Sequence, residues 1–235
     1  MQIYHILSLR FTTLRFTTLS LLISVSLWPA VTTAYEPDLE LGEEINELCA
    51  GCHGEYAQGS KDGEYPRLAG QPAAYIKKQM HLFRDRKRHN IPMYEYVDER
   101  QFPDAEIADV SAYIATIELP TSLPIFDEDN FDPLERLILA KKILNIRRAP
   151  GDIKAGKKLY KKECKSCHGR GGWGDREDGV PMIAGQYTEY LHRMVQQFIK
   201  KVWIHDEDEP DDEILAEFSK EELEDIFAYL SSTDD

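Results

Sequence analysis

The sequence predicts an all-α fold made of two similar helical domains, and three observations lead to this prediction. Apolar residues recur at helical spacing, as in Tyr75 to Phe83 and Tyr190 to Phe198, and no segment alternates as a β-strand would. The second half of the chain repeats the first half at a nearly constant offset. Each half also contains one Cys-x-x-Cys-His pentapeptide.

The repeat is defined by residues that recur 115 positions apart: His53 and His168, Pro66 and Pro181, Gly70 and Gly185, Tyr75 and Tyr190, Phe83 and Phe198. After one inserted residue the offset becomes 116, and it then pairs His89 with His205 and Tyr113 with Tyr229. A fixed offset over this length indicates a duplicated domain. We expect domains at 35–120 and 151–235, joined by a linker at 121–150.

The first 34 residues have the features of a secretory signal peptide. They contain no acidic residue, carry Arg10 and Arg15 before the apolar run at 19–28, and end in Thr32-Thr33-Ala34. The apolar run is too short to cross a bilayer. We expect cleavage near Ala34 and an exported mature chain with no membrane span, although association with a membrane surface stays open. An uncleaved anchor is the alternative.

Apolar spacing and a capping signal indicate two further helices. Before the first pentapeptide, Leu41, Ile45 and Leu48 recur at helical spacing. Ser219 and Glu222 form the pattern of a capping box that starts the last helix.

Within the linker, Asp132-Pro133 resembles an N-cap followed by proline, and it should open a helix that reaches about Ile146. Because this helix is strongly apolar, we expect it to pack between the two domains. A helix that docks another protein is the alternative.

The charge balance is strongly acidic. The chain has a net charge of −14, and without Arg10 and Arg15 it keeps 26 Lys and Arg against 42 Asp and Glu, or −16. Nucleic-acid binding is therefore excluded as a function class. Six lysines surround the second pentapeptide, at positions 154, 157, 158, 161, 162 and 165, whereas 206–235 holds fourteen acids and one base. These regions are either solvated faces or docking patches of opposite sign.

The two pentapeptides predict covalent haem. Cys49 and Cys52 in the first, and Cys164 and Cys167 in the second, are spaced to form thioethers with the two vinyl groups of one haem. The next residue, His53 or His168, then presents its imidazole to the iron. We therefore predict two covalently bound haem c groups. A structural zinc site and a disulfide framework are the alternatives, but neither needs the repeated histidine.

With these residues in view, the chain resembles the class I dihaem cytochromes of the c4 type, and more distantly the dihaem subunit of flavocytochrome sulfide dehydrogenases. The pentapeptides, Leu68-Ala69-Gly70-Gln71 and Ile183-Ala184-Gly185-Gln186 carry the resemblance. It implies two class I cytochrome c folds, each wrapped around one haem, in a periplasmic protein. It further implies an electron carrier between a redox donor and an acceptor of a respiratory chain, such as an oxidase, a reductase or a dehydrogenase.

The resemblance also implies a methionine as the second axial ligand of each iron, in the loop before the last helix. The first domain offers Met93, with Met80 as the rival. In the second domain the position that matches Met93 is Glu209, and His205 is the strong iron ligand of that loop; Met194 or a vacant position are the alternatives. Against this assignment, the matching His89 follows the charged segment Arg84–Arg88, which we interpret as a solvated basic face.

The function predicted is thus electron transfer rather than catalysis, and we assign no catalytic residue. The alternative is a dihaem subunit of, or a catalytic dihaem enzyme in, a sulfur-compound or peroxide oxidoreductase. The ligand in the loop from Trp203 to Glu213 distinguishes these two functions, because an open iron would bind small molecules.

Overall fold

The computed structural model describes residues 35–125, 128–144, 146–205 and 213–233. Within these ranges the chain is helical and forms no β-strand, apart from one isolated bridge between Asp175 and Val180. The all-α prediction is therefore confirmed. The predicted signal peptide at 1–34 lies outside the described residues. In the described ranges no helix is both long enough and apolar enough to cross a membrane.

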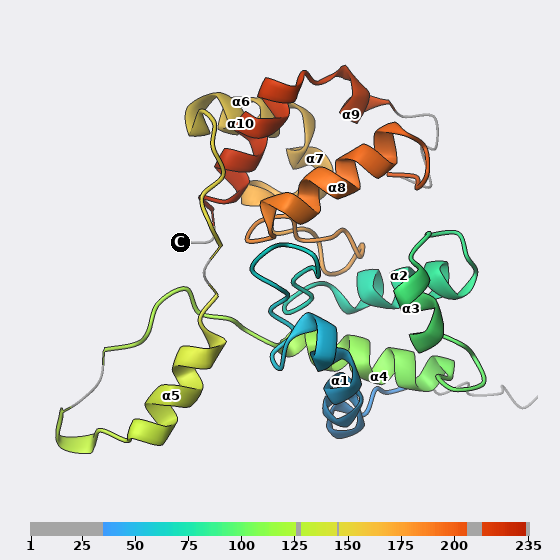
Figure 1. Ribbon diagram of the computed structural model, residues 1–235, viewed down its shortest axis with the longest axis vertical. Coiled ribbons are helices and arrows are strands. Elements are labelled where there is room, and N and C mark those ends of the chain that lie inside the picture. Colours follow the sequence, from blue (N-terminus) through green and yellow to red (C-terminus); the bar gives the residue numbers. More distant parts are fainter. Residues whose placement is uncertain (1–34, 126–127, 145, 206–212, 234–235) are drawn as a thin grey trace, which may run out of the picture. The chain divides into compact units, whose positions relative to one another are not determined.

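The first repeat is drawn in blue to green in Figure 1. Its helices are, in order, α1 (Leu39–His53), α2 (Ala73–Arg84), α3 (Ile91–Tyr96) and α4 (Asp104–Thr116). The Asp38 carboxylate caps α1, and the Asn90 side chain caps α3. Helices α1 and α4 pack against each other, and α2 packs on α4.

Helices α1 and α4 approach each other closely at Gly42. A Cβ there would lie 2.4 Å from the carbonyl oxygen of Asp109, so only glycine permits this approach. The crossing turns Gly42 and Ile45 inward and leaves Leu48 71% exposed. The helix that the spacing of Leu41, Ile45 and Leu48 predicts is present as α1. Of these three residues only Ile45 is buried, because α4 packs on the side that carries Gly42.

The second repeat has the same plan. Its elements are α6 (Ile153–Glu163), α7 (Lys165–His168), the 3₁₀ turn η2 (Arg170–Gly172), α8 (Thr188–Ile199), α9 (Ile214–Glu217) and α10 (Lys220–Leu230). Helix α6 packs on α10 at Gly156, where a Cβ would lie 1.8 Å from the Asp225 carbonyl oxygen. The predicted capping box of Ser219 and Glu222 is present at the start of α10.

Two glutamines join the repeats in a symmetric manner. The Gln71 side chain accepts from the Met182 amide (2.9 Å) and donates to the Met182 carbonyl (2.7 Å). Gln186, its counterpart, accepts from the Arg67 amide (3.0 Å) and donates to the Arg67 carbonyl (2.9 Å). Tyr187 adds its ring to the hydrophobic core of the first repeat. Both glutamines are buried, so these contacts hold one repeat against the other away from water.

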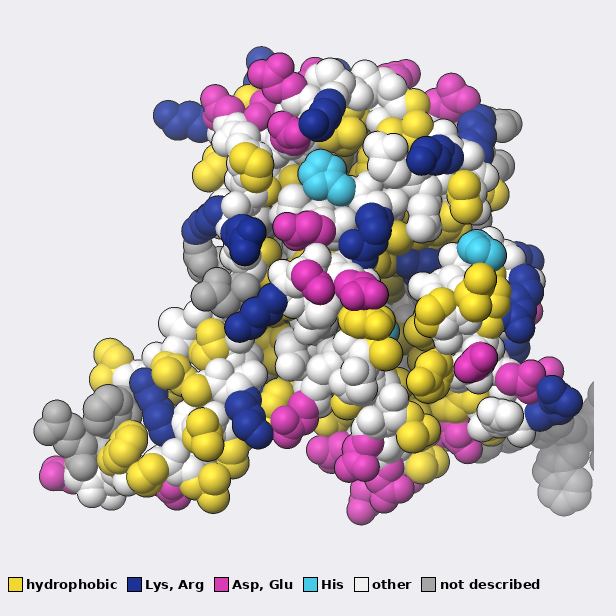
Figure 2. Space-filling model, in the orientation of Figure 1, with side chains coloured by type: hydrophobic (Ala, Val, Ile, Leu, Met, Phe, Trp, Pro, Cys, Tyr) yellow, Lys and Arg dark blue, Asp and Glu magenta, His cyan; other side chains and the backbone are white. Residues whose placement is uncertain are grey.

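The linker helix α5 (Pro133–Lys142) begins as predicted, with Asp132 as its N-cap and Pro133 in its first turn. The expectation that its apolar face packs between the domains is wrong. Leu134, Leu137 and Ile138 are exposed, and Figure 2 shows hydrophobic side chains gathered over this helix. Only beyond the helix does Leu144 enter the core of the first repeat. The sequence does not distinguish these two cases, because the apolar residues of an exposed helix face and of a buried one have the same spacing.

Candidate haem-binding sites

The two pentapeptides occupy equivalent turns. Cys49 to His53 forms the end of α1, while Cys164 is the cap residue between α6 and α7, and His168 is the last residue of α7. Each histidine is followed by a glycine with positive φ, 82° at Gly54 and 72° at Gly169. This conformation ends a helix and suits glycine, because it carries no Cβ.

The four cysteines are free thiols in this structure. Burial is the main cause that raises the pKa of Cys49, and likewise of Cys164, to about 11. Among the described residues no group of three or more His, Cys, Asp and Glu side chains is arranged to hold a metal ion. The zinc and disulfide alternatives therefore receive no support, and the sulfur atoms stay available for thioether bonds.

Each pentapeptide histidine is oriented by the same backbone partner. His53 Nδ1 lies 3.1 Å from the Pro66 carbonyl oxygen, and His168 Nδ1 lies 3.1 Å from the Pro181 carbonyl oxygen. A carbonyl only accepts hydrogen bonds, so Nδ1 must carry the proton and Nε2 keeps its lone pair. Metal-bound histidines are commonly fixed in this way by their second nitrogen.

Both imidazoles are held in the neutral form that binds iron. Burial lowers the pKa of His53, and the hydrogen bond to Pro66 opposes this effect, while the charge of Arg88 adds to it. Burial likewise lowers the pKa of His168, with Pro181 opposing and His205 adding to the decrease. A neutral imidazole has the free lone pair that a metal requires.

His205 lies close to His168 in the second site. The centroids of the two rings are 6.1 Å apart and their planes are inclined by 36°. The loop before the last helix thus brings its histidine next to the imidazole of the second pentapeptide. Glu209, the position that matches Met93, lies outside the described residues.

In the first site, Met93 sits on α3 and is half-buried against the core cluster that Cys49 also contacts. Met80, its rival, is fully part of that cluster at 7% exposure. A buried methionine on an amphipathic helix commonly serves packing, so Met93 stays the predicted ligand of the two.

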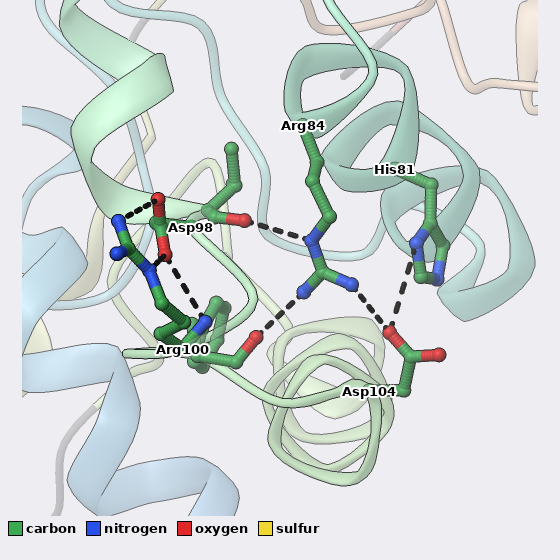
Figure 3. Close-up of polar contacts among 7 residues, drawn as sticks. His81, Arg84, Asp98, Arg100 and Asp104 are labelled. Atoms are coloured by element: carbon green, nitrogen blue, oxygen red, sulfur yellow. Dashed lines mark hydrogen bonds and ion pairs between the residues drawn. The ribbon is translucent and has the colours of Figure 1, made fainter.

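The loop that follows α3 is held in place by Arg84 (Figure 3). Its guanidinium donates to the carbonyl oxygens of Val97 (2.8 Å) and Phe102 (2.6 Å), and pairs with the Asp104 carboxylate (2.6 Å). The hydrogen bond from Arg84 is the main cause that lowers the pKa of Asp104. This clamp fixes both ends of the loop between α3 and α4, and so the position of the helix that carries Met93.

Two residues of the charged segment depart from the sequence interpretation: Arg84, which is half-buried in the contacts just described, and Arg88. Lys87 and His89 are exposed, as a solvated basic face requires, but Arg88 is only 7% exposed. Its guanidinium reaches the second repeat and donates to the Tyr190 hydroxyl at 2.8 Å. Nothing in the local sequence distinguishes it from Arg86, because its burial depends on the packing of the two repeats.

Comparison with known proteins identifies both repeats. The family model for cytochrome c matches residues 39–118 and 153–234. The chain is 27% identical to cytochrome c4 of Pseudomonas aeruginosa over 195 residues, which cover 82% of this chain and 87% of the relative. It is also 27% identical to the thiosulfate dehydrogenase electron acceptor of Stutzerimonas stutzeri, over 78% of each chain. The crystal structure of reduced cytochrome c4 from Pseudomonas stutzeri has the same fold, with a TM-score of 0.62 at 20% identity over 83% of this chain and 98% of the other.

Proposed function

The chain belongs to the cytochrome c family, with two copies of its domain, and from this premise we propose that it is a periplasmic dihaem electron carrier of a respiratory chain. The observation that carries the proposal is the pair of equivalent sites, each with two thiols and a neutral imidazole fixed by a proline carbonyl. The likeness to cytochrome c4 supports the same function.

We assign the residues as follows. Cys49, Cys52, Cys164 and Cys167 would hold two haem c groups through thioethers, and His53 and His168 would bind the two irons from one side. Met93 would complete the first site, and His205 the second. When bound, each haem supplies a one-electron couple between ferric and ferrous iron. One electron enters from a donor and leaves to an acceptor, and no bond forms or breaks.

The protein's own contribution is to hold these ligands still and to keep the two sites in a fixed relation. The proline carbonyls fix the histidine rings, Arg84 fixes the loop after α3, and Gln71 and Gln186 fix one repeat against the other. Rigid ligands limit the rearrangement that accompanies a change of iron charge. This arrangement suits transfer rather than catalysis.

A second candidate function is that of an electron-accepting partner of a sulfur-compound dehydrogenase. The likeness to the Stutzerimonas stutzeri protein favours it. In that case the exposed apolar side chains of α5 would be part of the contact with the dehydrogenase.

The test uses the purified mature protein, His205→Ala, Met93→Ala and the control His89→Ala. The unmodified protein should carry two haems per chain that resist acid–acetone extraction. Met93→Ala should abolish the near-infrared band of methionine ligation, and His205→Ala should make one site high-spin and open to carbon monoxide. His89 occupies the matching exposed position in the first repeat, so its replacement should leave the optical and EPR spectra unchanged.

An unchanged spectrum in His205→Ala would show that this residue is not a ligand. Carbon monoxide binding by the unmodified protein would instead favour an enzymatic role.

A further inference from the structure

Arg88 is a buried cation at the junction of the two repeats. It lies in the turn after α2, where its Nη1 donates to the Gln79 side chain at 2.8 Å. The guanidinium carbon lies 4.6 Å from the centroid of the Phe83 ring. On this side, therefore, Arg88 is held entirely by residues of α2.

The other side of the same guanidinium belongs to the second repeat. Its Nη2 donates to the Tyr190 hydroxyl at 2.8 Å and approaches the Met194 sulfur at 3.5 Å. Its central carbon lies 3.9 Å over the ring of Trp203. A flat guanidinium stacks well on an aromatic face, and the ammonium of a lysine does not reproduce this contact.

From Trp203 the contacts continue to the second site. The centroid of the Trp203 ring lies 4.5 Å from that of Phe198, and the Phe198 centroid lies 5.1 Å from that of His205. The His205 ring in turn lies 6.1 Å from the His168 ring. These are centroid separations typical of packed aromatic pairs. Arg88 thus lies at one end of a continuous series of ring contacts whose other end is the candidate ligand pair of the second repeat.

Arg88 also lies against the core of the first site. The Phe83 ring on which its guanidinium packs belongs to the hydrophobic core cluster of the first repeat, and Cys49 and Met93 pack against the same cluster. Within the described part of the chain no carboxylate forms an ion pair with Arg88. A buried charge needs a counter-ion, and the propionates of the bound haems are the carboxylates that these sites would receive. A positive charge near an iron favours the ferrous state.

We infer that Arg88 couples the two haem sites: its charge raises the reduction potential of the first site, and its stacking on Trp203 holds His205 in place at the second. The inference rests on the proposed function, since it needs haem at both sites and His205 as a ligand. It means that a residue of the first repeat helps to set the ligand geometry of the second site.

The experiment compares Arg88→Gln, Arg88→Lys, Trp203→Leu and the control Lys87→Gln in the full-length protein with both haems attached. Redox titration gives the potential of each site, and EPR and carbon monoxide binding give its spin state. Arg88→Gln should lower the potential of the first site and increase the high-spin fraction of the second. Arg88→Lys should leave the potential of the first site unchanged but still increase the high-spin fraction of the second. The reason is that lysine keeps the charge and lacks the flat guanidinium that stacks on Trp203.

Trp203→Leu should increase the high-spin fraction and leave the first potential unchanged. Lys87→Gln removes an exposed charge one residue away and should change neither quantity. If Arg88→Gln and Trp203→Leu both behave as Lys87→Gln does, the coupling is refuted while the proposed function stands. If the unmodified second site lacks the spectrum of two imidazoles, the ligand assignment fails and this inference fails with it.

Discussion

Replacing Gln186 by methionine should weaken the attachment of the two repeats. Methionine keeps the length and volume of the side chain but removes its hydrogen bonds to the Arg67 amide, the Arg67 carbonyl and the Tyr187 amide. These three backbone groups would then be buried without these partners, and each such group costs about 1–3 kcal/mol. The structure therefore predicts a loss of about 3–9 kcal/mol. Gln71→Met should cost less, about 2–6 kcal/mol, because it removes the partner of two groups, the amide and the carbonyl of Met182.

The assay is urea unfolding followed by circular dichroism. With a slope of about 2 kcal/mol per molar urea, a loss of this size moves the unfolding midpoint down by about 1 M or more. Gln101→Met is the matched control, since Gln101 is exposed. If replacing either buried glutamine lowers the unfolding midpoint no more than the control does, the glutamine contacts do not hold the repeats together. Equal shifts for the two variants would show that the hydrogen bond from the Tyr187 amide to Gln186 contributes nothing measurable.

Two further predictions concern the surface and the helix crossings. Changing the exposed Lys158, Lys161 and Lys162 to glutamate should slow association with one redox partner, most strongly at low salt, because surface charges steer the encounter of two proteins. The association rate is measured by stopped flow. If the rates of the variant and the unmodified protein are equal at low ionic strength, these lysines form only a solvated face. Gly156→Ala should force α6 and α10 apart and lower the free energy of unfolding by about 2–3 kcal/mol, which corresponds to a decrease of about 10–20 °C in Tm. The control is Gly51→Ala, whose added Cβ meets nothing within 4 Å, and it should leave Tm unchanged or slightly higher.

Several features of the site were predictable because they are local. The two pentapeptides place each histidine one residue after a cysteine, and helical geometry puts them on the same turn whatever the rest of the chain does. The caps at Asp132 and Ser219 were predictable for the same reason, since each bonds to amides two or three residues ahead. The internal repeat predicted two copies of one fold, which the family match confirms.

Other features depended on packing between distant residues. The sequence named His205 as a candidate ligand, but only the fold shows that its ring lies 6.1 Å from that of His168, 37 positions earlier in the chain. The repeated Ala-Gly-Gln segments indicated a family, and only the tertiary structure shows that their glutamines join the repeats.

The sequence by itself therefore determined the helices, their caps, the two attachment motifs and the duplication, because these follow from spacings of a few residues. Only the tertiary structure decided that Arg88 is buried while its neighbour Lys87 is exposed, and that the apolar face of α5 is exposed rather than covered. The physical reason is that burial is a property of surfaces brought together from different parts of the chain. A charged segment or an apolar stripe has the same local pattern whether or not another surface covers it.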